Sequence, residues 1–174
     1  EKLLPDGTVD ARDEHHYFKN GFQTDRLTLA GERIRWHSRF SYKGFRYVQV
    51  EGWPGGKPRL DAVTAQVVHT DVATTCHFDS DQPLLNWIHR ATVDTILNNL
   101  HSIPTDTPMY EKNGWTGDGM LGTEMFLRNL DADRLLAKWV RDIADTRGAD
   151  GAPLLIAPNP GWGHVRAPTW HAAY

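Results

Sequence analysis

Apolar and polar residues alternate at a period of two in several short runs between residues 27 and 70. Alternation at this period places the apolar side chains on one face of a strand, the pattern of a sheet with one wet side. The runs are separated by turn residues and fall at 27–29, 34–36, 40–42, 43–52 and 60–70. We therefore predict that this half of the chain forms short antiparallel strands belonging to a β-sandwich.

The apolar period changes to that of a helix near residue 79. Asp79-Ser80-Asp81 offers capping oxygens and Pro83 suits a first helical turn, so a helix is predicted from there to about Leu100. Two further helices are predicted, from Thr116 to about Asn129 and from Asp131 or Asp133 to Gly148. The first helix has Leu84, Ile88, Ala91, Thr95 or Ile96 and Leu100 at helical spacing, and the second carries Met120, Leu121, Met125 and Phe126. The third is expected to bury Leu135, Leu136, Trp139, Val140 and Ile143.

The change of period divides the chain into two predicted domains. Residues 1–72 are expected to form a partial β-sandwich, and residues 73–174 a helical domain. The segment 151–167 is rich in proline, glycine and tryptophan, and is predicted to be a long ordered loop. A loop of this length in a compact domain tends to serve function.

Composition limits the classes of partner. The 19 basic and 22 acidic residues are dispersed and give a net charge of -3, which argues against binding nucleic acid or an acidic membrane. The single Cys76 excludes an internal disulfide and a thiolate metal cluster. The adjacent His15 and His16 cannot face the same way on a strand, so a strand end is favoured over a metal site. The start of the chain lacks the features of a signal peptide, and no run reaches the ~18 apolar residues of a membrane span. Neither observation indicates a compartment.

Candidate chemistry concentrates between Asp106 and Asp118. These 13 residues hold three carboxylates, one indole and two glycines, in a loop that follows the predicted end of a helix. Glycoside hydrolysis requires one protonated carboxyl group as acid and a second carboxylate as nucleophile or base. Asp106, Glu111 and Asp118 provide such groups, and Trp115 provides an aromatic face. Crowding among the acids is a reason for one of them to keep its proton, and Glu111 is the candidate acid.

Structural roles explain the same residues about equally well on spacing alone. Asp118 could cap a helix, Asp106 could form an Asx-turn before Pro108, and Trp115 could be a core residue. The choice between a carboxylate site and local structural roles stays open at this level.

The stretch from Asp106 through Glu111 to Gly114-Trp-Thr-Gly-Asp118 resembles a motif of bacterial α-L-rhamnosidases. These are inverting glycoside hydrolases whose catalytic domain is an (α/α)6 toroid of six helical hairpins. The segments 23–26, 40–51 and 68–71 resemble the β-sandwich that precedes this toroid, so the likeness extends over about the whole chain. It implies a fold made of the C-terminal part of a β-sandwich and the first helices of the toroid.

The resemblance also implies roles for individual residues. Glu111 falls at the general acid, Asp106 and Asp118 fall at acids that bind rhamnose hydroxyls, and Trp115 and Trp170 fall at walls of the sugar pocket. Trp162 is a further candidate for the same neighbourhood. No metal or organic cofactor is implied, and the expected substrate is a rhamnose-containing oligosaccharide or glycoside.

The chain departs from the family at three points. Tyr110 stands where many members have an arginine, and His164 stands where an acidic residue is common. The family's catalytic base is a glutamate in a later hairpin, so the chain is expected to be a catalytically incomplete fragment. Two rivals remain: a sugar-binding protein without hydrolytic activity, and a toroid enzyme for another sugar. Since Lys112 is the only basic residue of the motif, a carboxylated sugar is disfavoured.

Overall fold

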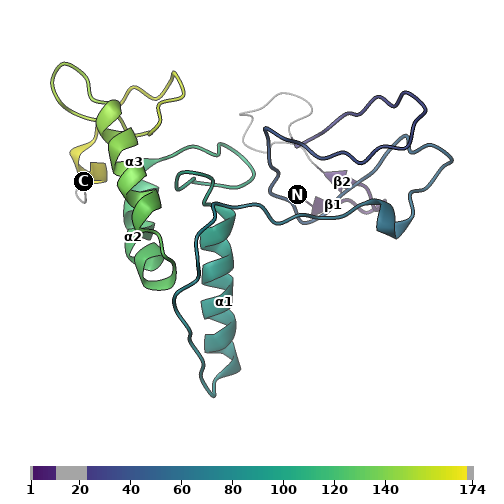
Figure 1. Ribbon diagram of the computed structural model, residues 1–174, viewed down its shortest axis with the longest axis horizontal. Coiled ribbons are helices and arrows are strands. Elements are labelled where there is room, and N and C mark those ends of the chain that lie inside the picture. Colours follow the sequence, from purple (N-terminus) through teal and green to yellow (C-terminus); the bar gives the residue numbers. More distant parts are fainter. Residues whose placement is uncertain (1, 11–22, 172–174) are drawn as a thin grey trace. The chain divides into compact units, whose positions relative to one another are not determined.

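The computed structural model describes residues 2–10 and 23–171 (Figure 1). Two compact units divide the chain after Val67. Strand pairing in the described residues occurs in the first unit, and all three α-helices lie in the second. The predicted order of β structure followed by helices is therefore confirmed. His15 and His16 lie outside the described residues.

The first unit contains one short antiparallel ladder. Strands β1 (Lys2–Leu3) and β2 (Val9–Asp10) pair with Lys2 opposite Asp10. The turn between them is closed by Gly7, whose N–H donates to the Leu4 carbonyl at 2.8 Å and whose φ is 82°, a conformation that glycine adopts without strain.

The strands predicted between residues 27 and 70 are wrong as elements of this structure. The described residues of this range contain no strand, and η1 (Leu60–Ala62) is a 3-10 helix where a strand was predicted to begin. Alternation specifies which face of a segment is apolar, but a strand exists only when a neighbouring segment accepts its backbone hydrogen bonds. The pattern contains no information about that neighbour.

The second unit contains helices α1 (Pro83–Asn98), α2 (Thr116–Asn129) and α3 (Asp133–Asp145). These bounds confirm the three predicted helices to within about one turn. Pro83 occupies the first turn of α1 as expected. The predicted capping by 79–81 is wrong, because Gln82 is the N-cap and makes no side-chain cap hydrogen bond. The short helix η2 (Pro168–His171) follows the segment 151–167, which contains neither helix nor strand, as predicted.

The core of the second unit forms where α2 and α3 meet the end of α1 and the segment near Ala157. Trp139 is 4% exposed, and its Nε1–H donates to the Ala157 carbonyl at 3.0 Å. Gly119 lies against the Trp139 ring, since a Cβ at this glycine would be 2.1 Å from Cη2. The buried residues of this core are Ile96, Leu100, Phe126, Leu130, Ala132, Leu135, Leu136, Trp139, Ile143 and Ala157.

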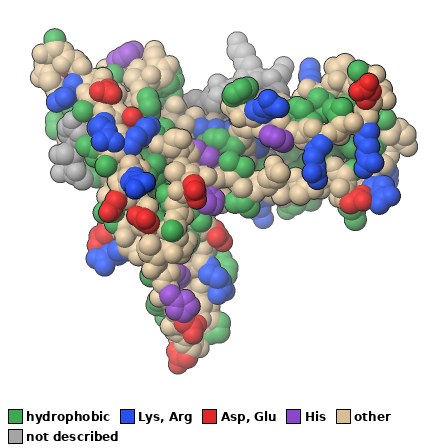
Figure 2. Space-filling view, viewed as in Figure 1, with side chains coloured by type: hydrophobic (Ala, Val, Ile, Leu, Met, Phe, Trp, Pro, Cys, Tyr) green, Lys and Arg blue, Asp and Glu red, His purple; other side chains and the backbone are tan. Residues whose placement is uncertain are grey.

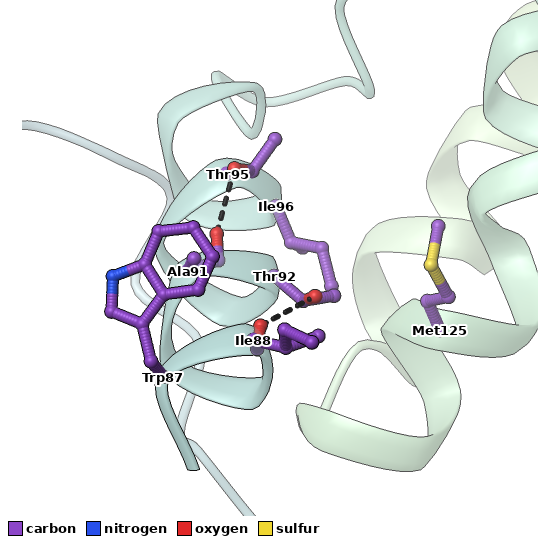
Figure 3. Close-up of a pocket in the computed structure, with 7 residues that line it drawn as sticks. All are labelled: Trp87, Ile88, Ala91, Thr92, Thr95, Ile96 and Met125. Carbon is purple, nitrogen blue, oxygen red and sulfur yellow. Dashed lines mark hydrogen bonds between the residues drawn. The ribbon is translucent and has the colours of Figure 1, made fainter. Parts of the chain in front are cut away.

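Several apolar positions of the helices are exposed, among them Val140, which was predicted to be buried. They are Leu84, Ile88, Leu121, Met125 and Val140, with exposed fractions from 43 to 77%. An apolar groove of about 340 Å³ lies between α1 and α2, and we call it the α1–α2 groove. Figure 3 shows the residues that line it. Its hydroxyls bond within α1, where Thr92 donates to the Ile88 carbonyl and Thr95 to that of Ala91. The lining residues are Trp87, Ile88, Ala91, Thr92, Thr95, Ile96 and Met125.

Acidic and basic side chains are interspersed over the face of the helical unit seen in Figure 2. One exposed pair is Arg128 with Glu124, one turn apart on α2, whose Nη2 and Oε1 atoms lie 2.6 Å apart. In the described part of the chain, no helix is long and apolar enough to cross a membrane.

Candidate active site

The loop that carries the acids is fixed at both ends by backbone hydrogen bonds. At its start, the Thr105 N–H donates to the Asn99 carbonyl at 2.8 Å. At its end, the Thr116 N–H donates to the Leu155 carbonyl at 2.8 Å, next to a bridge between Trp115 and Ile156. The acids between these anchors are therefore held by backbone that has little freedom.

Asp106 closes the loop onto Asn113. Its N–H donates to the Asn113 carbonyl at 3.0 Å, and its Oδ1 accepts the Asn113 N–H at 2.7 Å. Its Oδ2 accepts from the Thr107 hydroxyl at 3.0 Å. The Asx-turn alternative is thus replaced by a longer closure across 106–113. Burial raises the pKa of Asp106, the Asn113 and Thr107 donors lower it in part, and the negative charge of Glu111 adds to the rise.

Glu111 is held by Trp115. The indole Nε1–H donates to Oε2 of Glu111 at 2.7 Å, so this carboxylate oxygen has a fixed partner. Lys112, the next residue, has φ 56°, a left-handed conformation that costs a non-glycine residue about 1–3 kcal/mol. The loop therefore turns sharply directly after Glu111, and the hydrogen bond from Trp115 sets the direction of the carboxylate.

Asp118 lies in the first turn of α2 and is exposed. The N-cap of this helix is Trp115, which makes no side-chain cap hydrogen bond, so the capping role considered for Asp118 is not adopted. Although the residue is exposed, neighbouring atoms partly desolvate its carboxyl group and raise the pKa of Asp118; a backbone hydrogen bond opposes the rise, and the charge of Glu111 adds to it. Glu111 is thus close enough to act electrostatically on both aspartates.

Two other indoles, those of Trp162 and Trp170, contact the ring of Trp115. Its ring contacts that of Trp170 edge to face at a centroid distance of 5.5 Å, and that of Trp162 in the same manner at 6.0 Å. Trp170 also lies over Gly117, where a Cβ would be 2.6 Å from the Cδ2 atom of the ring. The structure therefore joins Glu111, Trp115 and Trp170 by direct contacts, and includes Trp162 in the same cluster.

Two residues that sequence reasoning did not select hold this cluster in place. Thr116 is 2% exposed and its hydroxyl donates to the Leu155 carbonyl at 3.0 Å. His171 follows Trp170, and its Nε2 lies 3.0 Å from the Leu154 carbonyl and 3.3 Å from the Thr116 hydroxyl. The sequence pointed to them only by position, since Thr116 follows Trp115 and His171 follows Trp170. Together they fix η2, and with it Trp170, to the start of α2.

The arrangement provides an oriented carboxyl group, two nearby acids and an indole wall. Such a set suits proton transfer to a neutral, hydroxyl-rich substrate with apolar C–H faces. Among the described residues, no group of three or more histidine, cysteine or acidic side chains is placed to hold a metal ion. The α1–α2 groove contains none of these acids.

Two family models match the chain. Residues 73–174 match the bacterial alpha-L-rhamnosidase 6 hairpin glycosidase domain, and residues 1–69 match the bacterial alpha-L-rhamnosidase concanavalin-like domain. The match to the helical residues includes the whole acid-bearing loop and Trp170. The β-sandwich and six-hairpin fold classes expected from the sequence are therefore both found.

Known proteins with similar sequences and structures carry the same name. An alpha-L-rhamnosidase of Streptomyces avermitilis is 37% identical over 92% of this chain, and one of Formosa agariphila is 36% identical over 71%. The crystal structure of the Streptomyces avermitilis enzyme complexed with L-rhamnose superposes on 92% of the chain with a TM-score of 0.77 and 35% identity. The structure from Dictyoglumus thermophilum covers 80%, with a TM-score of 0.74 and 38% identity.

The chain spans only a small share of these relatives. It corresponds to 15% of the Streptomyces avermitilis sequence and 14% of the Formosa agariphila sequence. It likewise covers 16% of the Dictyoglumus thermophilum chain.

Proposed function

Because this chain belongs to the bacterial α-L-rhamnosidase family, we propose that the full-length protein removes terminal α-L-rhamnose from glycosides by hydrolysis. The named activity of its relatives and the chemistry of the acid-bearing loop both support this proposal. The chain corresponds to 15% of one relative's length, so the activity is assigned to the whole protein. We place the boundary between the partial β-sandwich and the toroid helices at 72/73, close to the division after Val67.

Glu111 is the proposed general acid. The observation that supports it most directly is the 2.7 Å hydrogen bond from the Trp115 indole to Oε2, which fixes the carboxyl group beside the aromatic cluster. Asp106 and Asp118, both with raised pKa and both sensing the charge of Glu111, are proposed to bind rhamnose hydroxyls. Trp115 and Trp170 provide apolar walls for the C–H faces and the C6 methyl group of the sugar.

The reaction proceeds with inversion in this proposal. Glu111 transfers its proton to the glycosidic oxygen, and the bond between this oxygen and C1 breaks. A water oxygen forms the new bond to C1 from the opposite face, and its proton passes to a general base outside these 174 residues. The two carboxyl groups of an inverting pair stand about 6.5–9.5 Å apart, which leaves room for this water.

The test compares two substrates with different need for the acid. A disaccharide of α-L-rhamnose and glucose has a leaving group that requires a proton, whereas α-L-rhamnosyl fluoride releases fluoride with little help. Loss of a general acid costs about 10²–10⁴-fold. We expect Glu111→Gln in the full-length protein to lose about that much on the disaccharide and far less on the fluoride.

Glu124→Gln is the matched control, because Glu124 is an exposed acid of α2 that pairs with Arg128. This variant should keep the wild-type rate on both substrates. Equal losses on both substrates in Glu111→Gln would assign Glu111 a role other than acid. A full-length protein that binds rhamnose but hydrolyses neither substrate would be a sugar-binding protein. Proton NMR of the first product should show β-L-rhamnose, and initial release of the α-anomer would contradict inversion.

A further inference from the structure

Trp162 is an exposed indole on a well-fixed segment. Its exposed fraction is 46%. The Asn159 side chain ties the backbone on both sides of it: Nδ2 donates to the Trp162 carbonyl at 3.0 Å, and Oδ1 accepts the Gly161 N–H at 2.8 Å. The exposure of this indole is therefore not the consequence of a loose loop.

The ends of the segment are also docked. The Ala157 N–H donates to the Gly114 carbonyl at 2.9 Å, and the Leu155 N–H donates to the Val165 carbonyl at 3.1 Å. Gly163, with φ 68°, lies against Ile156, since a Cβ there would be 2.9 Å from Cδ1. Trp162 thus projects from backbone that is held against the loop carrying the acids.

Trp162 is connected to the acid through one residue. Trp115 contacts the Trp162 ring at 6.0 Å with an interplanar angle of 69°, and the same indole donates to Glu111. Trp170 contacts Trp115 as well, and lies over Gly117 next to Asp118. The aromatic cluster therefore extends from the residues proposed to hold rhamnose to an indole with no such assigned role.

A glycosidic oxygen has a sugar on each side. If Glu111 protonates this oxygen and rhamnose lies among the residues proposed to hold it, the leaving group lies next to them in the same cluster, where Trp162 is exposed. A pyranose presents an apolar C–H face that an indole can cover. Building on the proposed function, we infer that Trp162 forms a leaving-group subsite that binds the pyranose ring attached to rhamnose.

The test uses the full-length protein and two leaving groups of different size. Fluoride is a single atom and cannot reach Trp162, whereas glucose in the rhamnose–glucose disaccharide can. Trp162→Ala should lower kcat/KM for the disaccharide about three- to tenfold, mainly through KM, and leave the value for α-L-rhamnosyl fluoride unchanged. Trp162→Phe keeps a smaller aromatic face and should recover part of the loss.

Trp53→Ala is the control, since Trp53 is an exposed indole of the other unit. Equal losses on both substrates, or no loss on either, would overturn the subsite. The same holds if Trp162→Ala unfolds and Trp162→Phe, stable by thermal unfolding, does not discriminate between the substrates. A wild-type protein that hydrolyses neither substrate would refute the proposed function and the subsite together, whereas failure of the subsite alone leaves the wild-type protein active on both substrates.

Discussion

Substitution of Gly117 by alanine should displace a wall of the proposed sugar pocket. Gly117 lies in the first turn of α2, and an added Cβ would be 2.6 Å from Cδ2 and 2.7 Å from Cε3 of Trp170. The backbone itself accepts alanine, which is favoured over glycine in a helix by about 0.8–1.0 kcal/mol. The clash with the indole is therefore the dominant effect.

The size of the displacement follows from the contact distance. Ordinary contact begins near 3.4 Å, so the ring must retreat by about 0.8 Å, the difference between 3.4 and 2.6 Å. Trp170 is in edge contact with Trp115, which holds Glu111. Because a misplacement of about 1 Å near a reacting centre can cost about 10²-fold in rate, we expect kcat/KM for rhamnosides to fall by up to that amount.

Gly119→Ala is a matched control in the same helix. Its Cβ would be 2.1 Å from Cη2 of Trp139, a buried ring of the core whose indole donates to the Ala157 carbonyl. Overpacking of this kind costs about 1–3 kcal/mol of unfolding free energy. Thermal unfolding and steady-state kinetics of both variants in the full-length protein separate the two effects. Gly119→Ala should lose stability, and Gly117→Ala should lose activity beyond its loss of stability.

Two results would refute this reasoning. Wild-type kinetics and stability in Gly117→Ala would show that Trp170 does not lie over this glycine. A loss of stability with unchanged kcat/KM would show that the ring is there but forms no part of the substrate site. The double variant with Trp170→Phe should regain stability and not activity, since a smaller ring relieves the clash without restoring the wall.

Three other changes test the site and the exposed helix faces. Asp118→Asn removes an acid whose pKa is raised in the folded state above its ordinary value of 3.8. The folded wild type holds this proton more tightly than the unfolded chain, so its unfolding free energy declines as pH rises from 3.8 through the raised pKa. The variant lacks this decline, so urea unfolding should show its stability increasing relative to wild type over that pH range. Trp115→Phe deletes the donor to Glu111, worth about 1.5–3 kcal/mol for a charged partner, and should lower kcat at least about tenfold with little change in KM. The isolated 174-residue chain should self-associate in sedimentation runs through the α1–α2 groove, and replacing Trp87 and Ile88 by lysine should reduce this association.

The helices were predictable because their signals are local. Pro83 at the start of α1 and the spacing of Leu135, Trp139 and Ile143 along α3 depend only on neighbours in the chain. Burial was less predictable, because three glycines of α2, Gly117, Gly119 and Gly122, are buried together with Phe126. Apolar periodicity assigns the core to large residues, and it overlooks glycines such as Gly117 and Gly119, on which the rings of Trp170 and Trp139 lie.

The prediction of strands between residues 27 and 70 was wrong for a different reason. Val48 and Val50 have the β-branched shape that suits a sheet, yet both are exposed in the described structure. Their stabilisation would have to come from cross-strand neighbours, which a single-sequence pattern does not identify. Helical hydrogen bonds join residues four apart, so a helix needs no such partner for its backbone.

The candidate site depends both on residues that are neighbours in the chain and on contacts between distant residues. Its acids lie within 13 residues, so sequence reasoning could collect Asp106, Glu111 and Asp118 into one loop. The hydrogen-bond partners of Asp106 and Glu111 are also near in the chain. The contacts that fix the aromatic cluster to the start of α2 are distant: Thr116 bonds to the Leu155 carbonyl 39 residues away and contacts His171 across 55. Each such contact requires the closure of a long loop, and the packing of α2 and α3 must offset the entropic cost of that closure. The direction of the Glu111 carboxylate therefore depends on the packing of the helical unit. A core variant such as Gly119→Ala should lower the rate only if it also disturbs the contacts of Thr116 with Leu155 and His171.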